Sequence, residues 1–397
     1  MQPEPPPDSI PSPVGTSRFR LGRLRSPQEL TAALQSHIVG QEAAIDAAVR
    51  ALTISAAGLR DPNRPIASLL LVGPTGVGKT ELAKQLACQV TGDPDNLCRI
   101  DMNTLAQEHY SASLAGAPPG YAGAKEGLTL FDPALIAGNH SRPGLVLFDE
   151  VEKAHATVLR SLLQILDSGV LRLSAGNETI DFRNAIVLFT SNLGSAEVAA
   201  HERRRRGSSS LQRLAAPFRP GARRDSQQIV ADVVEQFFDP ELYNRFDEVV
   251  HFAPLTQTSA AKIVDLELVR LRNQLSAMHI DWMPDDDVRS LLINKGFDST
   301  YGARHMRRTV RTTLLAPIAE AVVTAPDADN RSHHTLSTTV AQEESSPPSP
   351  GLCRRHWKRP TVRITAIWAH RRESLLPGRR SLRRRRPCQR RSQHSDC

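Results

Sequence analysis

A glycine-rich segment that ends in lysine and threonine is the first group of residues able to do chemistry. Gly73-Pro-Thr-Gly-Val-Gly78-Lys79-Thr80 fits the pattern G-x-x-x-x-G-K-[ST] and lies between a short apolar run and a helical pattern. Glycines let the backbone wrap phosphates, and the N–H groups of the loop and of a helix N-terminus bind negative charge. The lysine of such a loop reaches the β- and γ-phosphates, and the threonine hydroxyl ligates Mg²⁺. We expect a nucleotide to bind Gly73, Pro74, Thr75, Gly76, Val77, Gly78, Lys79 and Thr80.

Two acidic residues and an asparagine follow later apolar runs. The run that ends at Phe148 continues into Asp149 and Glu150, and a further run ends in Phe189-Thr-Ser-Asn192. Asp149 is placed to hold the Mg²⁺ shell, and Glu150 to orient and deprotonate an attacking water. Acids often end strands and asparagine often caps a turn, but downstream of a phosphate-binding loop the pattern favours ATP hydrolysis. Asn192 would then reach the γ-phosphate or the water, because open α/β sheets present ligands at the carboxyl edge of their strands.

The elements that must position these side chains alternate in type. Short apolar runs at 67–72, 144–148, 185–190 and 248–252 predict buried strands. Apolar residues with helical periodicity at 41–58, 82–90 and 158–166 predict helices. Such alternation predicts a mostly parallel sheet with helices on both faces. After Pro254 we expect no more strands. Helical patterns at 264–278, 285–294 and 303–323, the last with a kink at Pro317, predict a small second subdomain.

Composition and charge exclude several classes of protein. Of the 397 residues 40% are hydrophobic and 23% are charged, which is typical of a folded globular chain. The net charge of +8 belongs to the tail: residues 326–397 hold 15 Arg and one Lys against six acidic residues, which leaves residues 1–325 at −2. A mildly acidic body argues against a nucleic-acid motor. Five cysteines form no metal-binding or disulfide pattern, and no apolar run is long enough for a membrane span, so we expect a reduced, cytoplasmic protein that binds no membrane.

We divide the chain into four segments. Residues 1–27 are a proline-rich leader that we expect to be disordered, 28–253 the α/β subdomain, 254–325 the helical subdomain and 326–397 a basic low-complexity tail. Within the α/β subdomain, residues from about 200 to 228 resemble a basic insertion without folded structure. The abrupt change of composition at the tail also allows the hypothesis that the tail is an out-of-frame extension.

Nine ordered motifs give the chain a specific resemblance. They look like the second ATPase domain of ClpB and ClpA, which are Clp-type AAA+ unfoldases, and they span roughly residues 28–323. The motifs are Ile38-Val-Gly-Gln41, the phosphate-binding loop, Ile100-Asp-Met102, Gly116-Ala-Pro-Pro-Gly-Tyr-Ala-Gly123, Phe148-Asp-Glu-Val-Glu-Lys-Ala-His155, Asp181-Phe-Arg-Asn184, Thr190-Ser-Asn-Leu-Gly194, Asn244-Arg-Phe-Asp-Glu248 and Tyr301-Gly-Ala-Arg304.

The resemblance implies an α/β P-loop AAA+ fold with a small helical subdomain, and a homo-hexameric ring with ATP and Mg²⁺ at subunit interfaces. By motif match, Ile38 and Val39 flank the adenine, and Asn192 and Arg304 are the two sensors of the nucleotide. Arg245 is the arginine finger that reaches a neighbouring subunit's γ-phosphate. The alternative for Arg245 is a surface ion pair with Asp247 or Glu248.

The resemblance also assigns a substrate loop. Gly120, Tyr121, Ala122 and Gly123 resemble the aromatic pore loop that grips a polypeptide, and flanking glycines permit such a loop to move. The alternative is a Gly/Pro turn that holds one tyrosine. Between Asn192 and Asn244 the sequence has no Ile-Gly-Leu or Ile-Gly-Phe tripeptide, so docking to a ClpP-like protease is not expected.

The function that these inferences favour is an ATP-dependent protein unfoldase or remodelling chaperone. Hydrolysis would turn the helical subdomain against the α/β subdomain and draw an unfolded or misfolded polypeptide through a central pore. The alternative is a degenerate Clp paralogue that binds ATP and assembles without threading substrate.

Overall fold

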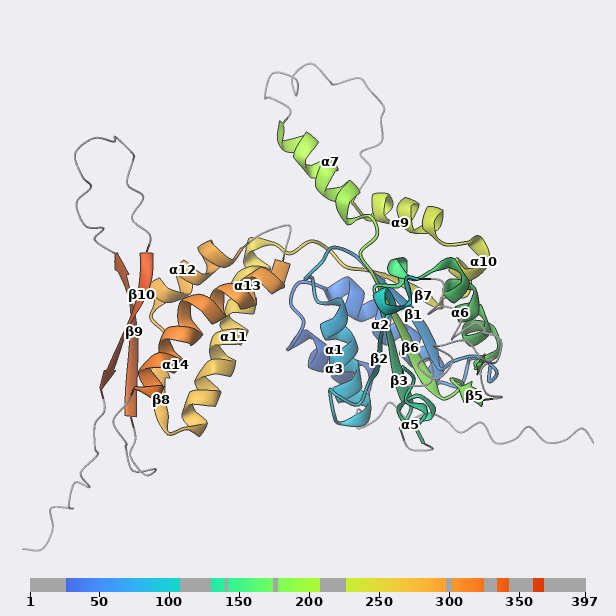
Figure 1. Ribbon diagram of the computed structural model, residues 1–397, viewed down its shortest axis with the longest axis horizontal. Coiled ribbons are helices and arrows are strands. Elements are labelled where there is room, and N and C mark those ends of the chain that lie inside the picture. The colour runs from blue at the N-terminus through green and yellow to red at the C-terminus, as the bar shows by residue number, and fades with distance from the viewer. Residues whose placement is uncertain are drawn as a thin grey trace, which may run out of the picture.

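The computed structural model describes residues 26–107, 130–139, 142–173, 178–207, 226–297, 302–324, 334–342 and 360–367. These residues form an α/β body and a helical body, which are joined by the segment between β7 (Glu248–His251) and α11 (Gln257–Ala277) (Figure 1). The expected pore loop at 120–123 and nearly all of the expected leader lie outside the described residues. Within the described part of the chain, no helix combines the length and apolar character that crossing a membrane requires.

The α/β body contains a five-stranded sheet in the order β2-β3-β6-β1-β7, and every neighbouring pair is parallel. Its strands are β1 (Ala67–Val72), β2 (Cys98–Asp101), β3 (Gly144–Asp149), β6 (Ala185–Ser191) and β7. The predicted fold class is therefore confirmed. Four strands lie where the apolar runs indicate. β2 escapes that analysis because it alternates buried and exposed residues over only four positions.

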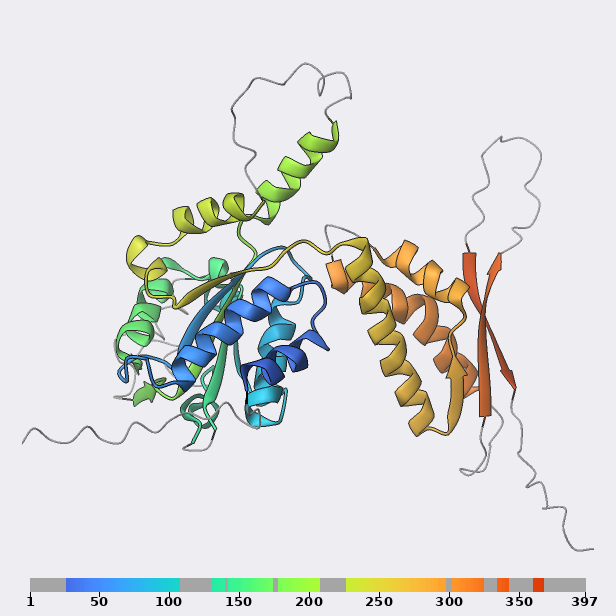
Figure 2. The ribbon, with the colours of Figure 1, turned by 180° about the vertical axis from the view of Figure 1, so that it is seen from behind.

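Side chains of the central strands divide between two cores. In β1, Leu70 and Val72 pack into one core, whereas Leu69 and Leu71 pack into the other. β3 and β6 alternate in the same way, because successive side chains of a strand point to opposite faces. One face is covered by α1 (Pro27–Gln35), α2 (Glu42–Ala56) and α3 (Lys79–Thr91), as Figure 2 shows. The other face carries α6 (Ala156–Ser168) and α9 (Ser226–Phe237).

Short elements complete this body. They are α5 (Pro133–Ala137), α10 (Pro240–Tyr243), the 3₁₀ turns η1 (Met102–Leu105) and η3 (Val151–Lys153), and the antiparallel pair β4 (Val170–Leu173) and β5 (Glu178–Asp181).

The helical body consists of α11, α12 (Asp286–Gly296), α13 (Gly302–Val310) and α14 (Ala316–Val323) around their own apolar core. The kink predicted at Pro317 corresponds to a π-helical turn at Arg311–Leu315, directly before α14. A proline lacks the N–H that a continuous α-helix needs, and a widened turn before it accommodates that loss.

The prediction that strands stop after Pro254 is wrong. β8 (Ile280–Met283), β9 (His334–Gln342) and β10 (Pro360–Ile367) form a three-stranded sheet on the side of the helical body remote from the α/β body (Figure 1). Leu336 and Thr338 of β9 are buried while Thr335 and Ser337 are exposed, and Trp282 Nε1 donates to Thr338 Oγ1 at 3.3 Å. The tail therefore supplies two strands, and "low-complexity" does not describe those parts of it.

The basic insertion also needs a correction. α7 (Ser195–Gly207) is helical through the four arginines at 203–206, so the absence of folded structure expected from residue 201 onward is wrong for that stretch. Alanine, glutamate and arginine all favour helix, and this propensity outweighs the charge run. Residues 208–225 lie outside the described part, and the limits assigned to the four segments stay a prediction.

Candidate nucleotide site

A cavity of about 280 Å³ is lined by residues of both bodies. The structure brings most of the predicted site residues to it: Ile38, Val39, Thr75, Gly76, Val77, Gly78, Lys79, Thr80, Asp149, Glu150, Asn192 and Arg304. Three predicted residues within the described part are not in its lining, namely Gly73, Pro74 and Arg245. The motifs thus converge at the carboxyl edge of the sheet, as parallel topology requires.

The phosphate-binding loop has a backbone that only glycine adopts easily. Gly73 has φ +150°, and a Cβ there would lie 2.7 Å from the carbonyl oxygen of Phe252. Gly78 has φ +112° and precedes α3 as its N-cap without a side-chain hydrogen bond to the helix. The N–H groups of the first turn of α3 are therefore available to an anion in the cavity.

Lys79 is buried inside this loop, with 7% of its surface exposed. Its Nζ donates to Gly73 O at 2.6 Å, Pro74 O at 2.8 Å and Asn192 Oδ1 at 2.9 Å. Burial lowers the pKa of Lys79 to about 8, although the Glu152 carboxylate and, more weakly, that of Asp149 act to raise it. Gly73 and Pro74 thus contribute to the site by holding the lysine.

Asp149 and Glu150 are tied to the neighbouring strand by one hydroxyl. Thr190 Oγ1 donates to Asp149 Oδ1 at 2.5 Å and accepts the Glu150 N–H at 2.9 Å. Glu150 adopts the left-handed conformation, with φ 60° and ψ 53°, which costs about 1–3 kcal/mol for a residue other than glycine. Such strain concentrates at functional sites, and Glu150 lines the cavity.

An arginine contacts Asp149 from the edge of the sheet. Arg99 on β2 pairs with Asp149 Oδ2 through Nη2 at 2.5 Å and Nε at 3.0 Å. Both oxygens of this buried carboxylate therefore have partners, which keeps its orientation fixed.

The donor set suits Mg²⁺ and a nucleoside triphosphate. Thr80 and Asp149 offer hard oxygen atoms to the same cavity. The described residues contain no cluster of three or more His, Cys, Asp or Glu that would hold an ion alone. Magnesium is commonly held by one or two protein oxygens together with substrate phosphates, so these residues fit it. When bound, Mg²⁺ would neutralise charge on the β- and γ-phosphates.

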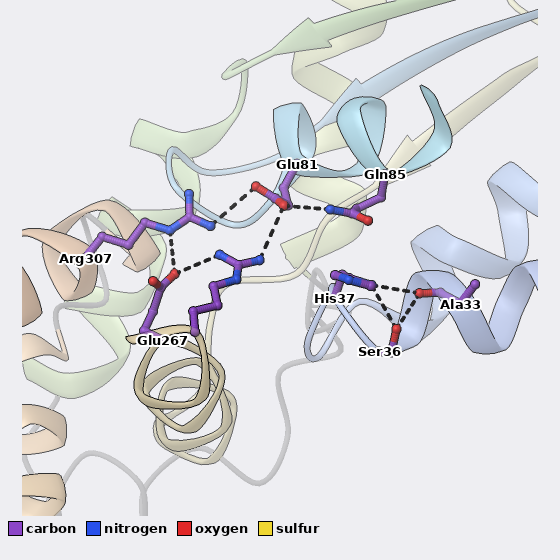
Figure 3. Close-up of polar contacts among 8 residues, drawn as sticks. Ala33, Ser36, His37, Glu81, Gln85, Glu267 and Arg307 are labelled. Atoms are coloured by element: carbon purple, nitrogen blue, oxygen red, sulfur yellow. Dashed lines mark hydrogen bonds and ion pairs between the residues drawn. The ribbon is translucent and has the colours of Figure 1, made fainter. Parts of the chain in front are cut away.

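The segment with Ile38 and Val39 is fixed against the loop by Gln41. Gln41 Nε2 donates to Ala253 O at 2.9 Å and Val77 O at 3.4 Å, and its Oε1 accepts the Ala253 N–H at 2.9 Å. His37, which also lines the cavity, contacts the end of α1 through Ser36 and Ala33 (Figure 3).

The helical body reaches the loop at the start of α13. Gly302 has φ +56°, and the Ala303 N–H donates to Gly76 O at 2.9 Å. This contact brings Arg304 and Arg307 to the cavity. The positive charge of Arg304 acts to lower the pKa of Lys79.

A four-residue ion-pair cluster bridges the two bodies beside the cavity (Figure 3). Arg307 on α13 contacts Glu267 on α11 at 2.9 Å and Glu81 on α3 at 3.4 Å. Arg270 contacts Glu267 at 3.2 Å, and Gln85 donates to Glu81 at 3.1 Å. Burial acts to raise the pKa of Glu81, but the hydrogen bond from Gln85 and the charges and contacts of the arginines keep it below its ordinary value.

Arg245 lies outside the cavity of its own chain. Its side chain is 45% exposed, and its Nε pairs with Asp167 Oδ1 at 2.5 Å. The two alternative partners considered from sequence have other contacts, since Asp247 pairs with Arg64 and Glu248 with Arg50. The surface ion pair thus exists, but with a residue on α6.

Sequence reasoning missed several residues that shape the site. Arg99, Thr190, Glu152, Glu267, Arg270 and Arg307 contact predicted residues or line the cavity. Glu152 and Thr190 lie inside quoted motifs, and Arg99 directly precedes one. For Glu152 and Thr190, motif membership was the only signal, because their contacts join positions 40 residues apart.

Comparison with known proteins agrees with the fold. Residues 64–249 match the family model "AAA domain (Cdc48 subfamily)", and residues 255–333 match "C-terminal, D2-small domain, of ClpB protein". An "ATP-dependent protease ATP-binding subunit-like protein" of Rhodococcus erythropolis is 51% identical over 315 residues, which are 79% of this chain and 86% of the relative. A similarly described protein of Pseudomonas aeruginosa, AmiB, is 42% identical over 77% of this chain and 80% of its own length.

Longer relatives share the same region. The chaperone protein ClpB of Rhizobium meliloti is 42% identical over 73% of this chain, which spans only 31% of that protein. Among solved structures, a closed-state cryo-EM reconstruction of Hsp104 with ATPγS and FITC-casein aligns with a TM-score of 0.62 and 30% identity, over 78% of this chain and 50% of the other.

The fold, the phosphate-binding loop and the acidic strand end define a P-loop ATPase of the AAA+ class. More narrowly, the chain belongs to the Clp-type AAA+ family and corresponds to its second ATPase domain. It is an ATPase, as this family membership establishes.

Proposed function

We propose that copies of this chain assemble as a homo-hexameric ring and use ATP hydrolysis to thread unfolded polypeptide through its centre. The observation that carries the proposal is the cavity itself, which is lined by the α/β body on one side and by α11 and α13 on the other. A change of nucleotide in such a cavity changes contacts with both bodies, so it can turn one against the other.

Within one subunit, each residue has a proposed task. Lys79 and the N-terminus of α3 bind the phosphates, while Thr80 and Asp149 hold the metal. Glu150 accepts a proton from the attacking water, and Asn192 orients that water or the γ-phosphate. Arg304 contacts the nucleotide from the helical body. Their common position around one cavity supports these roles.

The position of Arg245 supports a ring. Arg245 is half exposed and lies outside the cavity of its own chain. Once its contact with Asp167 breaks, its side chain can extend to the cavity of a neighbouring subunit. Such a residue stabilises charge on the transferred phosphoryl group and makes turnover depend on assembly.

The names of the relatives support action on polypeptides: ClpB is described as a chaperone, and the Hsp104 structure contains casein.

The experiment is ATP turnover and sizing of the purified chain, with and without unfolded casein. We expect casein to stimulate turnover, and Glu150→Gln to retain ATP in a stable ring without hydrolysing it. Tyr121→Ala should keep basal turnover but lose the stimulation, and Lys79→Ala is the control without nucleotide binding. Turnover that is indifferent to polypeptide would contradict threading and favour a non-threading Clp paralogue.

A further inference from the structure

Glu152 contacts Asn192 of the cavity lining without lining the cavity itself. It belongs to η3, which follows β3, and lies three positions after Asp149. Its Oε1 accepts two hydrogen bonds from one residue, the Asn192 backbone N–H at 3.1 Å and the Asn192 side-chain Nδ2 at 3.2 Å. These contacts join the turn after β3 to the end of β6.

The remaining contacts of Asn192 complete its orientation. Its Oδ1 accepts from Lys79 Nζ at 2.9 Å and from Thr75 Oγ1 at 3.3 Å. A lysine ammonium can only donate and a carboxylate can only accept, so chemistry fixes which end of the amide faces which partner. The Asn192 amide carries two N–H bonds, and its contact with Glu152 uses one of them.

Burial of Glu152 costs free energy that its hydrogen bonds to Asn192 do not fully offset. Its second oxygen, Oε2, is buried and makes no hydrogen bond to any residue that the structure describes. A buried carboxylate oxygen without a partner is unfavourable, and a functional role of the residue is one explanation for its retention. Glu152 is also the carboxylate that acts most strongly to raise the pKa of buried Lys79.

We propose that Glu152 is a positioning residue that holds the amide of Asn192 in the orientation required for ATP hydrolysis. The inference rests on the proposed role of Asn192 and adds the group through which that role is set. Glu152 contacts Asn192 but is not in the cavity lining, so its loss should act on the rate of hydrolysis. Well below the pKa of Lys79, where the loss of one neighbouring negative charge leaves the lysine protonated, nucleotide affinity should stay nearly unchanged.

The test is a double-mutant cycle on the full chain with Glu152→Ala, Asn192→Ala and the double variant. Glu152→Ala should lower kcat about tenfold, the scale seen when a supporting hydrogen bond behind a functional group is lost. At pH 6.5, well below the pKa of Lys79, the dissociation constant for a fluorescent ADP should stay within about twofold, a split that a merely structural role would not produce. On the Asn192→Ala background, removal of Glu152 should cause no further loss.

Two conservative variants sharpen the result. Glu152→Gln keeps an acceptor oxygen in the same place and should recover most of the rate, whereas Lys153→Ala, the exposed next residue of the turn, is the matched control and should match the unmodified chain. The proposal is overturned if the losses from Glu152→Ala and Asn192→Ala multiply, if Glu152→Gln is as slow as Glu152→Ala, or if Glu152→Ala abolishes ADP binding. If Asn192→Ala itself keeps full turnover, the role proposed for Asn192 fails as well, so the two failures are distinguishable.

Discussion

The charge of Lys79 depends on a balance between burial, which lowers its pKa to about 8, and neighbouring carboxylates. Below about pH 8 the Lys79 amine is protonated and attracts phosphate, and above about pH 8 it loses this charge. Affinity for ADP without added magnesium should therefore be constant up to about pH 8. It should then fall by up to about tenfold for each further pH unit, because binding must take up a proton.

Calorimetric titration with ADP between pH 6.5 and 9.5 measures this dependence. Lys84→Gln, which removes another lysine of the cavity lining, is the control and should retain the break near pH 8. An affinity that is flat to pH 9.5 would mean that Lys79 does not bind the phosphates in its titrating form.

At the scale of elements, the cluster of Glu81, Glu267, Arg270 and Arg307 joins three helices from both bodies. Glu81→Gln and Arg307→Gln should each lower ATP turnover, and the double variant should be no slower than either one. We expect a coupling of about 1 kcal/mol, or about fivefold in rate, at the upper end for exposed ion pairs. ATP turnover of the two single variants, the double variant and the unmodified chain measures this coupling energy.

The neighbouring arginine supplies the control for that cycle. Arg308→Gln removes an exposed charge of the same helix that is not in the cavity lining, and it should leave turnover unchanged. Independent, multiplying losses from Glu81→Gln and Arg307→Gln would show that the cluster does not act as one link between the bodies.

The tail strand β9 offers a stability test at the same scale. Leu336 is 2% exposed in the core of the helical body, so Leu336→Ala should lower the free energy of unfolding by about 2–5 kcal/mol. Thr335→Ala, exposed on the same strand, should change it by less than about 0.5 kcal/mol. Denaturant-induced unfolding of the two variants and the unmodified chain measures these changes in the free energy of unfolding. Equal, small effects would mean that β9 does not belong to that core.

The sequence predicted the parts of this molecule that local patterns encode. The apolar runs at 67–72 and 144–148 coincide with buried strands, and the loop from Gly73 to Thr80 has a spacing that few other functions require. β9 and β10 were missed because their pairing partners are distant in sequence and their mixture of Thr, Ser and Arg carries no long apolar pattern. Contacts such as Arg99 with Asp149 depend on strand order, which periodicity does not reveal.

At the scale of the whole molecule, the proposed ring has ATP where two copies of the chain meet. The cavity contains the phosphate-binding loop, the acids and Arg304 of one chain, while Arg245 lies elsewhere on the same chain. The proposed ring requires a head-to-tail arrangement in which Arg245 of each subunit reaches the cavity of the next, and repetition of that contact closes the ring. Neither Lys79 nor Arg245 could then be removed without loss of turnover.

The most direct test mixes two inactive variants, Lys79→Ala and Arg245→Ala, and measures ATP turnover of the mixture. If each active site combines Lys79 of one subunit with Arg245 of its neighbour, random mixed rings restore both groups at about a quarter of the sites, and turnover returns. Turnover that stays at the level of the separate variants, although the two chains co-assemble, would contradict the shared site.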